Sequence, residues 1–203
     1  MRVTGLGSLR AYWEAVRPPG DLPRRSQIDP RGIESALDIA FLAERVAPGI
    51  ARFRLAGQRI DALMGMSVRG MPLSALIEPD ARAAFGEALE RCFAGPAIVE
   101  MALRGANGLG LPRLEARLLL LPLRTEDGRV SRALGGFASE GRIGATPRRF
   151  DLVAVEASPV FPAEGTFDGA EARQPLHGFA EDRAAYAPRP RGRPRLRVIR
   201  NDD

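Results

Sequence analysis

The side chains that most often carry out chemistry in proteins are scarce in this chain. Cys and His occur once each, as Cys92 and His177, among 203 residues. A single thiol can form neither a disulfide within the chain nor a CxxC metal or redox centre. A single imidazole excludes an HExxH zinc motif, and the sequence has no Walker A segment, GxSxG elbow or GxGxxG turn. We therefore expect a protein that is not an enzyme and holds no metal.

Arginine supplies all of the positive charge, because the 30 basic residues include no Lys. With 25 acidic residues the formal net charge is +5, and the pI is about 10.7. Such a charge would suit nucleic acid or another anionic surface. The segment 189–200 alone holds six Arg and no acid. The high pI therefore reflects a nearly balanced body with one basic tail.

Part of that tail, Pro190–Pro194, reads Pro-Arg-Gly-Arg-Pro and resembles the core of an AT-hook. An extended segment of this kind lies in the narrow minor groove of A·T tracts, where the negative potential favours Arg. The candidates for DNA contact are Arg191, Arg193 and Arg195. The alternative is a solvated tail or a docking peptide. Leu196, Val198 and Ile199 favour docking as a strand, on a partner or on the chain's own sheet.

No stretch of the sequence has the length and hydropathy of a signal peptide or a membrane span. The first 13 residues lack an apolar central region. The longest aliphatic run, Leu118–Leu123, contains Pro122 and is far too short to cross a bilayer. We expect a cytoplasmic protein without a membrane partner, and a lone thiol agrees with a reducing compartment.

A short amphipathic helix is predicted near the N-terminus. Leu9, Tyr12, Trp13 and Val16 follow the spacing i, i+3, i+4 and i+7, which places them on one helix face. The following Pro-Pro-Gly ends the helix. This face either covers an apolar surface of its own domain or forms a dimer contact, since the only Trp and one of the two Tyr lie here.

The middle of the chain changes from strand to helix patterning and back. Alternation with period two predicts strands, as where Phe53 lies between Arg52 and Arg54. Helical spacing predicts several short helices between residues 57 and 95. Strands are expected at 41–46, 51–56, 99–104, 114–121 and 130–139. The order indicates an α+β fold, a five-stranded antiparallel sheet with short helices on one face.

These patterns divide the chain into three regions. We expect an N-terminal helical region at residues 1–39, one compact domain at 40–140 and a Pro- and Arg-rich arm at 141–203. The arm has no sustained periodicity, so we expect it to be extended and largely disordered. The segment 150–155 (FDLVAV) is an exception that could pack on the domain.

The predicted order of elements is two strands, several short helices and three further strands. This order resembles that of a PAS domain. Individual residues resemble one bacterial branch, PAS family 5, over about residues 8–140. They are Tyr12-Trp13, Arg24, Asp29-Pro30, Phe53-Arg54-Leu55-Ala56-Gly57, Gly65 and Arg69-Gly70. Gln58 departs from the family, which usually has Thr there. The resemblance implies a PAS fold with a sensory or regulatory role, and it carries over no catalytic residue.

The resemblance also bears on cofactors. Many PAS domains hold a ligand between the sheet and the short helices, and many others hold none and pair only with partners. Haem-binding members usually present a His from the helices, where this chain has none. Flavin photochemistry requires an Asn-Cys-Arg-Phe-Leu-Gln context, and Cys92 lies in Glu-Arg-Cys-Phe-Ala instead. We therefore expect neither haem nor flavin, whereas an unidentified small apolar ligand stays an open alternative to a filled core.

The candidates for lining a ligand pocket are residues that a filled core would also need. They are Phe53, Leu55, Leu63, Met64, Phe85, Leu89 and Phe93. Arg54 and Arg69 could meet the anionic head of a ligand, because the guanidinium group offers a fork to carboxylates. Arg54 could equally pair with a Glu or Asp of its own chain.

The function predicted from these features is that of a non-catalytic sensory or regulatory PAS module. We expect a homodimer that also contacts a signalling protein, with a ligand or partner shifting the population between packings of the short helices. The alternative is a DNA-associated transcriptional regulator that acts through the AT-hook-like tail.

Overall fold

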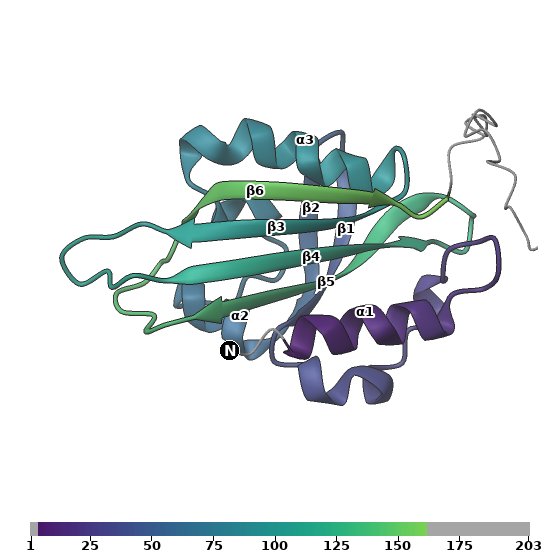
Figure 1. The fold of residues 1–203 in the computed structure, drawn as a ribbon, viewed down its shortest axis with the longest axis horizontal. Helices are drawn as coiled ribbons and strands as arrows, with labels where there is room; N and C mark the ends of the chain where they lie inside the picture. Colours follow the sequence, from purple (N-terminus) through teal and green to yellow (C-terminus); the bar gives the residue numbers. More distant parts are fainter. Residues whose placement is uncertain (1–3, 162–203) are drawn as a thin grey trace, which may run out of the picture. The chain divides into compact units, whose positions relative to one another are not determined.

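A single antiparallel sheet organises the chain. The computed structural model describes residues 4–161, whose six strands have the order β2-β1-β5-β4-β3-β6 (Figure 1). The strands are β1 (Ala40–Ala47), β2 (Ile50–Ala56), β3 (Ala97–Gly105), β4 (Glu115–Arg124), β5 (Val130–Glu140) and β6 (Phe150–Pro159). The helices are α1 (Thr4–Val16), α2 (Gln58–Met64) and α3 (Arg82–Phe93), with short 3-10 turns η1 (Arg25–Gln27), η2 (Pro30–Ala36), η3 (Leu73–Leu76) and η4 (Pro79–Ala81).

The predicted α+β fold is confirmed, and the sheet has one strand more than predicted. The extra strand, β6, pairs antiparallel with β3, from Gly105 opposite Phe150 to Ala97 opposite Pro159. The pairing shifts between Ala102 and Leu103, so Val153 has no residue opposite it. This irregularity interrupts the period-two alternation by which a strand is recognised in sequence. The segment 150–155 thus packs on the domain as part of its sheet.

Two hairpins have glycine at the position where the backbone needs a positive φ. Between β1 and β2, Gly49 has a φ of 68°, and between β4 and β5, Gly128 has a φ of 82°. Glycine adopts this conformation without the steric cost that a Cβ would add. The Pro-Gly and Asp-Gly pairs of the sequence therefore mark the two turns that set the strand registers.

Helices cover both faces of the sheet. On the inner face, α2, α3 and η3 contribute to the larger apolar core, with Phe53 and Phe85 among its fully buried side chains. On the outer face, α1 and η2 contribute to a second core around Leu121 and Leu134. Figure 1 views the sheet from this outer side, with α1 in front and α3 beyond β6. Two apolar layers thus hold the sheet between them.

The pair Gly135-Gly136 on β5 allows close approach from both faces. A Cβ on Gly135 would lie 2.1 Å from the ring of Phe41 on the inner side. A Cβ on Gly136 would lie 2.5 Å from Leu6 and 3.1 Å from Leu9, both of α1. Because both positions lack a side chain, Phe41 and α1 can each lie directly on the backbone of β5.

The face of α1 that carries the dimer-contact candidates is turned inward. Leu9 and Trp13 have no exposed surface, and the Trp13 Nε1–H donates to the carbonyl oxygen of Pro122 over 3.0 Å. Tyr12 and Val16 are half-buried and pack against the same core. Leu9 and Trp13 therefore cover the chain's own sheet, which was the other alternative for this helix face.

The helices between residues 4 and 161 are all too short or too polar to cross a membrane.

Candidate functional site

The space between the sheet and the inner helices is occupied by side chains. Six of the predicted pocket residues lie together in the inner core, and each is at most 5 % exposed: Phe53, Leu63, Met64, Phe85, Leu89 and Phe93. None of the three hollows described below is lined by any of the six. The structure brings these residues together as packing partners of one another.

Leu55, the seventh pocket candidate, does not belong to this core. Leu42 pairs with Leu55 and the next residue, Ala43, pairs with Phe53, so a β-bulge leaves Arg54 unmatched. A bulge reverses the face to which the following side chain points. Leu55 consequently lies on the outer face, where it is 50 % exposed.

The two arginine candidates do not enter the inner core either. Arg54 forms an ion pair with Glu44, which also contacts Arg132 with an Nη1–Oε1 distance of 2.5 Å. Arg69 is exposed in the loop between α2 and η3. Arg54 therefore pairs within its own chain, which was the alternative to binding a ligand head.

Cys92 lies on the buried side of α3 and has no exposed surface. Removal from water disfavours the thiolate, so burial raises the pKa of the Cys92 thiol. A thiol in this state is a packing group and not a nucleophile. Between residues 4 and 161, no group of three or more Cys, His, Asp or Glu side chains could hold a metal. His177, Arg191, Arg193 and Arg195 lie outside the described residues.

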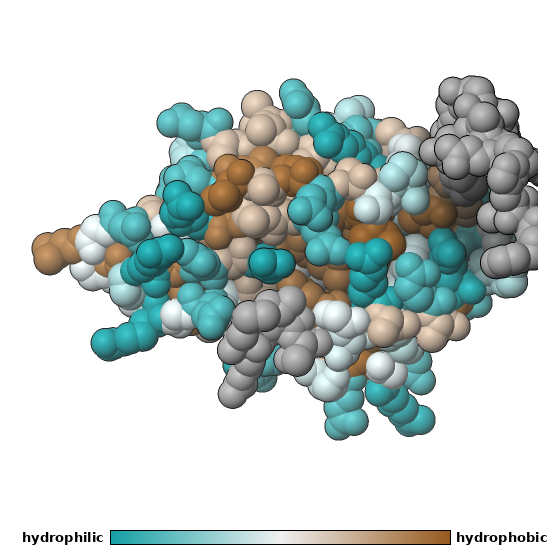
Figure 2. Space-filling view, in the orientation of Figure 1, coloured by the Kyte–Doolittle hydropathy of each residue, from teal (hydrophilic) through white to brown (hydrophobic). Residues whose placement is uncertain are grey.

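The outer face of β3, β4 and β6 is only partly covered by α1. Beside the start of this helix the structure has a hollow of about 310 Å³, which continues along the sheet into a second one of about 680 Å³. Figure 2 shows apolar surface on this side of the molecule, interrupted by polar side chains. Ala102 and Arg117 line both hollows. We call this area the open sheet face.

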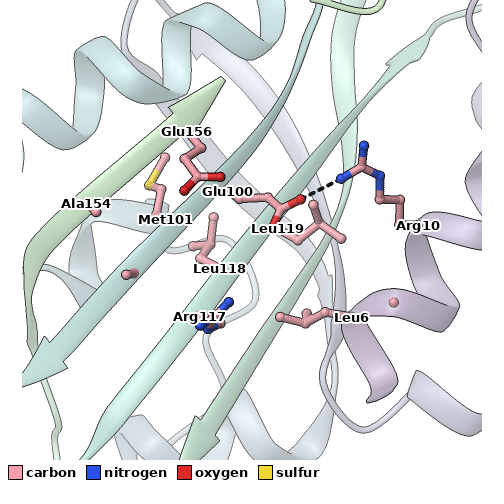
Figure 3. A pocket seen from close by; sticks show the side chains of 11 residues that line it. Leu6, Arg10, Glu100, Met101, Arg117, Leu118, Leu119, Ala154 and Glu156 are labelled. Carbon is pink, nitrogen blue, oxygen red and sulfur yellow. Dashed lines mark hydrogen bonds and ion pairs between the residues drawn. The ribbon is translucent and has the colours of Figure 1, made fainter. Parts of the chain in front are cut away.

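Charged residues on the open sheet face form an incomplete set of pairs. Glu100 on β3 lies directly opposite Glu156 on β6, an arrangement of like charges that destabilises a sheet. Arg10 of α1 reaches Glu100 with an Nη1–Oε1 distance of 2.7 Å (Figure 3). Among residues 4–161, neither Glu156 nor the exposed Arg117 of β4 has an ion-pair partner. The face thus presents an acid, Glu156, and a base, Arg117, that lack ion-pair partners among the described residues.

A third hollow, of about 140 Å³, lies at the other end of the outer face, where η1 and η2 meet β1, β2 and β5. We call it the Arg25 groove. Its lining is apolar apart from Arg25 and includes Ile28, Ile33, Leu37, Leu42, Leu55 and Leu134.

Arg148 is a buried group that pattern analysis did not single out. Its side chain is 1 % exposed and donates to three backbone carbonyls, those of Ile143, Ala106 and Pro112, over 2.5, 2.9 and 3.0 Å. The chain has 30 Arg, and nothing in the local pattern distinguishes Arg148 from the others. Arg148 joins the segment before β6 to the loop between β3 and β4.

One protein family matches most of the chain. A family model described as "PAS domain" matches residues 1–138. No curated protein matches the chain. Among solved structures, an RNA-binding Light-Oxygen-Voltage receptor is 22 % identical with a TM-score of 0.39, over 61 % of this chain and 37 % of that one. The chain therefore spans little more than a third of that receptor.

Two further structures are similar over about half of the chain. The light state of the blue-light photoreceptor Aureochrome1 LOV is 13 % identical with a TM-score of 0.37, over 55 % of this chain and 88 % of that one. A structure described as "Flavin Analogue Sheds Light on Light-Oxygen-Voltage Domain Mechanism" is 16 % identical with a TM-score of 0.38, over 55 % and 84 %.

Proposed function

Because the chain belongs to the PAS domain family, we propose that it is a non-catalytic sensory or regulatory module that acts through protein–protein contacts of the open sheet face. The single observation that carries the proposal is the contrast between the two faces. Phe53, Phe85 and their neighbours occupy the inner space, whereas β3, β4 and β6 expose apolar and charged groups on the outer side. A surface of this composition is typical of a protein interface.

The first partner that we propose is a second copy of the chain. A two-fold symmetric interface brings the same patch of both copies together, so it needs groups that complement themselves. Arg117 and Glu156 meet this requirement, since they lie on the same face with β3 between them and neither has an ion-pair partner among residues 4–161. Arg117 of one copy would then meet Glu156 of the other.

The proposed mechanism is a shift of population between two packings. Arg10 ties α1 to the open sheet face through Glu100, so a protein that binds this face contacts α1 as well. A partner or ligand that favours one position of α1 stabilises that position by its difference in affinity. The further partner is a signalling protein, and we place the module in the cytoplasm, where an unpaired thiol such as that of Cys92 stays reduced.

Sedimentation velocity over a concentration series tests the interface. We expect wild type to dimerise and both Arg117→Glu and Glu156→Arg to shift the equilibrium toward monomer, because each change opposes like charges. The double variant restores opposite charges and should restore the dimer. Arg91→Glu is the matched control, since Arg91 is exposed on α3. A monomer at every concentration, or single variants that dimerise as wild type does, would exclude the proposed contact.

A further inference from the structure

The Arg25 groove exposes large apolar side chains that the fold could have covered. Leu55 is 50 % exposed and Leu37 is 42 % exposed, and both line this groove. The bulge at Arg54 is the reason that Leu55 lies here, because regular alternation would place it in the inner core beside Phe53. Two neighbouring exposed leucines around a concave surface are characteristic of a binding site.

Arg25 is the charged group of the groove. It is half-buried, and between residues 4 and 161 its side chain has neither an ion pair nor a hydrogen bond. The adjacent Arg24, by contrast, pairs with Glu126. No acidic residue lines the groove. A half-buried guanidinium without a counter-ion, next to apolar walls, leaves five N–H donors directed to solvent or to a ligand.

Two acids in the neighbouring elements have other partners. Glu44, which follows Leu42 on the outer side of β1, is shared by Arg54 and Arg132. Asp29 accepts a hydrogen bond from the backbone N–H of Arg31 over 2.9 Å. The positive charge of Arg25 is therefore not neutralised by either of these carboxylates.

We propose that the Arg25 groove binds a short amphipathic carboxylate, with its carboxylate on Arg25 and its apolar part against Leu42, Leu55 and Leu134. The guanidinium fork matches both oxygens of a carboxylate, and the leucines match an alkyl chain or a small ring. The volume of about 140 Å³ holds about five groups of the size of a water or a methylene. A fatty acid of about six carbons fits these dimensions.

This site is separate from the open sheet face and does not depend on the proposed dimer. The groove lies at β2, β1 and β5, whereas the open sheet face includes the opposite edge strand, β6. It also lies on the outer side of the sheet, away from the inner core in which a ligand was predicted from the sequence. A carboxylate in the groove would touch η2, against whose Gly32 the ring of Tyr12 packs closely. A bound ligand would thus contact η2, which in turn contacts α1.

Methyl-labelled NMR of the full chain, titrated with hexanoate, tests the proposal. We expect saturable shift changes at Leu42, Leu55 and Leu134, and weaker changes with hexanol, which has the alkyl chain without the charge. Arg25→Gln should weaken hexanoate binding about tenfold and leave hexanol unaffected, because it removes a charge-assisted pair. Arg31→Gln is the matched control, since Arg31 is exposed on η2 and does not line the groove.

Leu55→Glu is a second variant, in case Arg25→Gln does not fold. Leu55 is half-exposed, so the change leaves the inner core intact. It places a carboxylate beside Arg25 and should abolish hexanoate binding. The proposal is overturned if hexanoate does not saturate, if its shifts centre on Phe53 and the inner core, or if either variant binds as wild type does. Saturable binding of an acidic peptide without binding of hexanoate would also overturn it, and would identify a protein contact.

Discussion

The indole Nε1–H of Trp13 donates a hydrogen bond to the carbonyl oxygen of Pro122 across 3.0 Å, which joins α1 to the central strand β4. Pro122 has no N–H to offer the sheet, but its carbonyl remains available to a donor on the outer face. The guanidinium of Arg17 lies 5.5 Å from the centre of the same indole. Trp13 thus combines apolar burial with a specific polar contact, which fixes the position of α1 along the strand.

Replacing Trp13 should therefore destabilise the fold. We expect Trp13→Ala to lower the free energy of unfolding by about 3–5 kcal/mol, because it opens a cavity and leaves the Pro122 carbonyl without its donor. Urea denaturation followed by far-UV circular dichroism measures the change. Glu14→Ala, at an exposed position of the same helix, should change the stability by less than about 0.5 kcal/mol. Equal effects of the two changes would contradict the structure.

Replacing glycine by alanine should have opposite effects on stability at Gly136 of β5 and at Gly7 of α1. Gly136→Ala should destabilise by about 1–3 kcal/mol, because its Cβ would overlap Leu6 of α1. Gly7→Ala, in α1 itself, meets no atom within 4 Å and should stabilise by about 0.5–1 kcal/mol through helix propensity. Thermal unfolding distinguishes the two signs. If Gly136→Ala were neutral, α1 could not lie as close to β5 as described.

Glu90 on α3 links this helix to the first hairpin. Its carboxylate accepts from Arg45 Nε over 3.1 Å and from the backbone N–H of Gly49 over 2.8 Å. Burial by itself raises the pKa of Glu90, but the hydrogen bonds from Arg45 and Gly49 together outweigh it and hold the pKa below its ordinary value of 4.5. A lowered folded-state pKa means that the ionised group stabilises the fold above the unfolded pKa. This contribution is lost as the pH falls through the folded-state value.

Acid should therefore destabilise wild type more than a variant without this carboxylate. Glu90→Gln is expected to be less stable than wild type at neutral pH, with a difference that shrinks as the pH falls below 4.5. Urea denaturation midpoints measured from neutral pH to about pH 3 give the pH dependence of stability for wild type and for Glu90→Gln. Glu87→Gln, exposed on the same helix, should follow the wild-type slope. If the stability difference between Glu90→Gln and wild type did not change with pH, ionisation of Glu90 would not be the source of the stabilisation.

The fold was predictable from the sequence wherever a regular pattern operates. Period-two alternation located β2, because Ala51 and Phe53 face the inner core while Arg52 is exposed. Glycine located the hairpin turns, since positive φ angles favour this residue. Each of these signals is local, and it depends on a few neighbouring residues only.

The features that the sequence patterns did not predict depend on contacts between distant segments. The bulge at Arg54 moves Leu55 to the outer face, although the sequence around it alternates normally. Helical spacing identified the apolar face of α1 but not its partner, because a dimer and the chain's own sheet bury that face equally well. The Arg25 groove likewise exists only because η2 lies across β1 and β2. Such sites follow from the tertiary structure and have no local signature.

The Cys92 thiol should be inert in the native protein. Burial raises its pKa, so little thiolate exists at neutral pH, and the side chain has no exposed surface. We expect Ellman's reagent to leave wild type unmodified at about pH 8 and to titrate one thiol after unfolding in urea. Cys92→Ala gives the background signal. Rapid labelling of the folded chain would instead place Cys92 near solvent and reopen a reactive role.

Arg148 should be the arginine whose loss costs most stability among those of the loops. Its three carbonyl acceptors lie in two segments, 106–112 and 143, so its removal takes this donor away from all three oxygens. We expect Arg148→Met to destabilise by at least about 2 kcal/mol, and Arg148→Lys to recover part of this, since an ammonium keeps the charge without the planar fork. Arg149→Met, at the adjacent exposed position, should have little effect. Hydrogen exchange should report faster opening of residues 105–114 in Arg148→Met alone, and equal exchange in both Met variants would mean that Arg148 does not hold this loop.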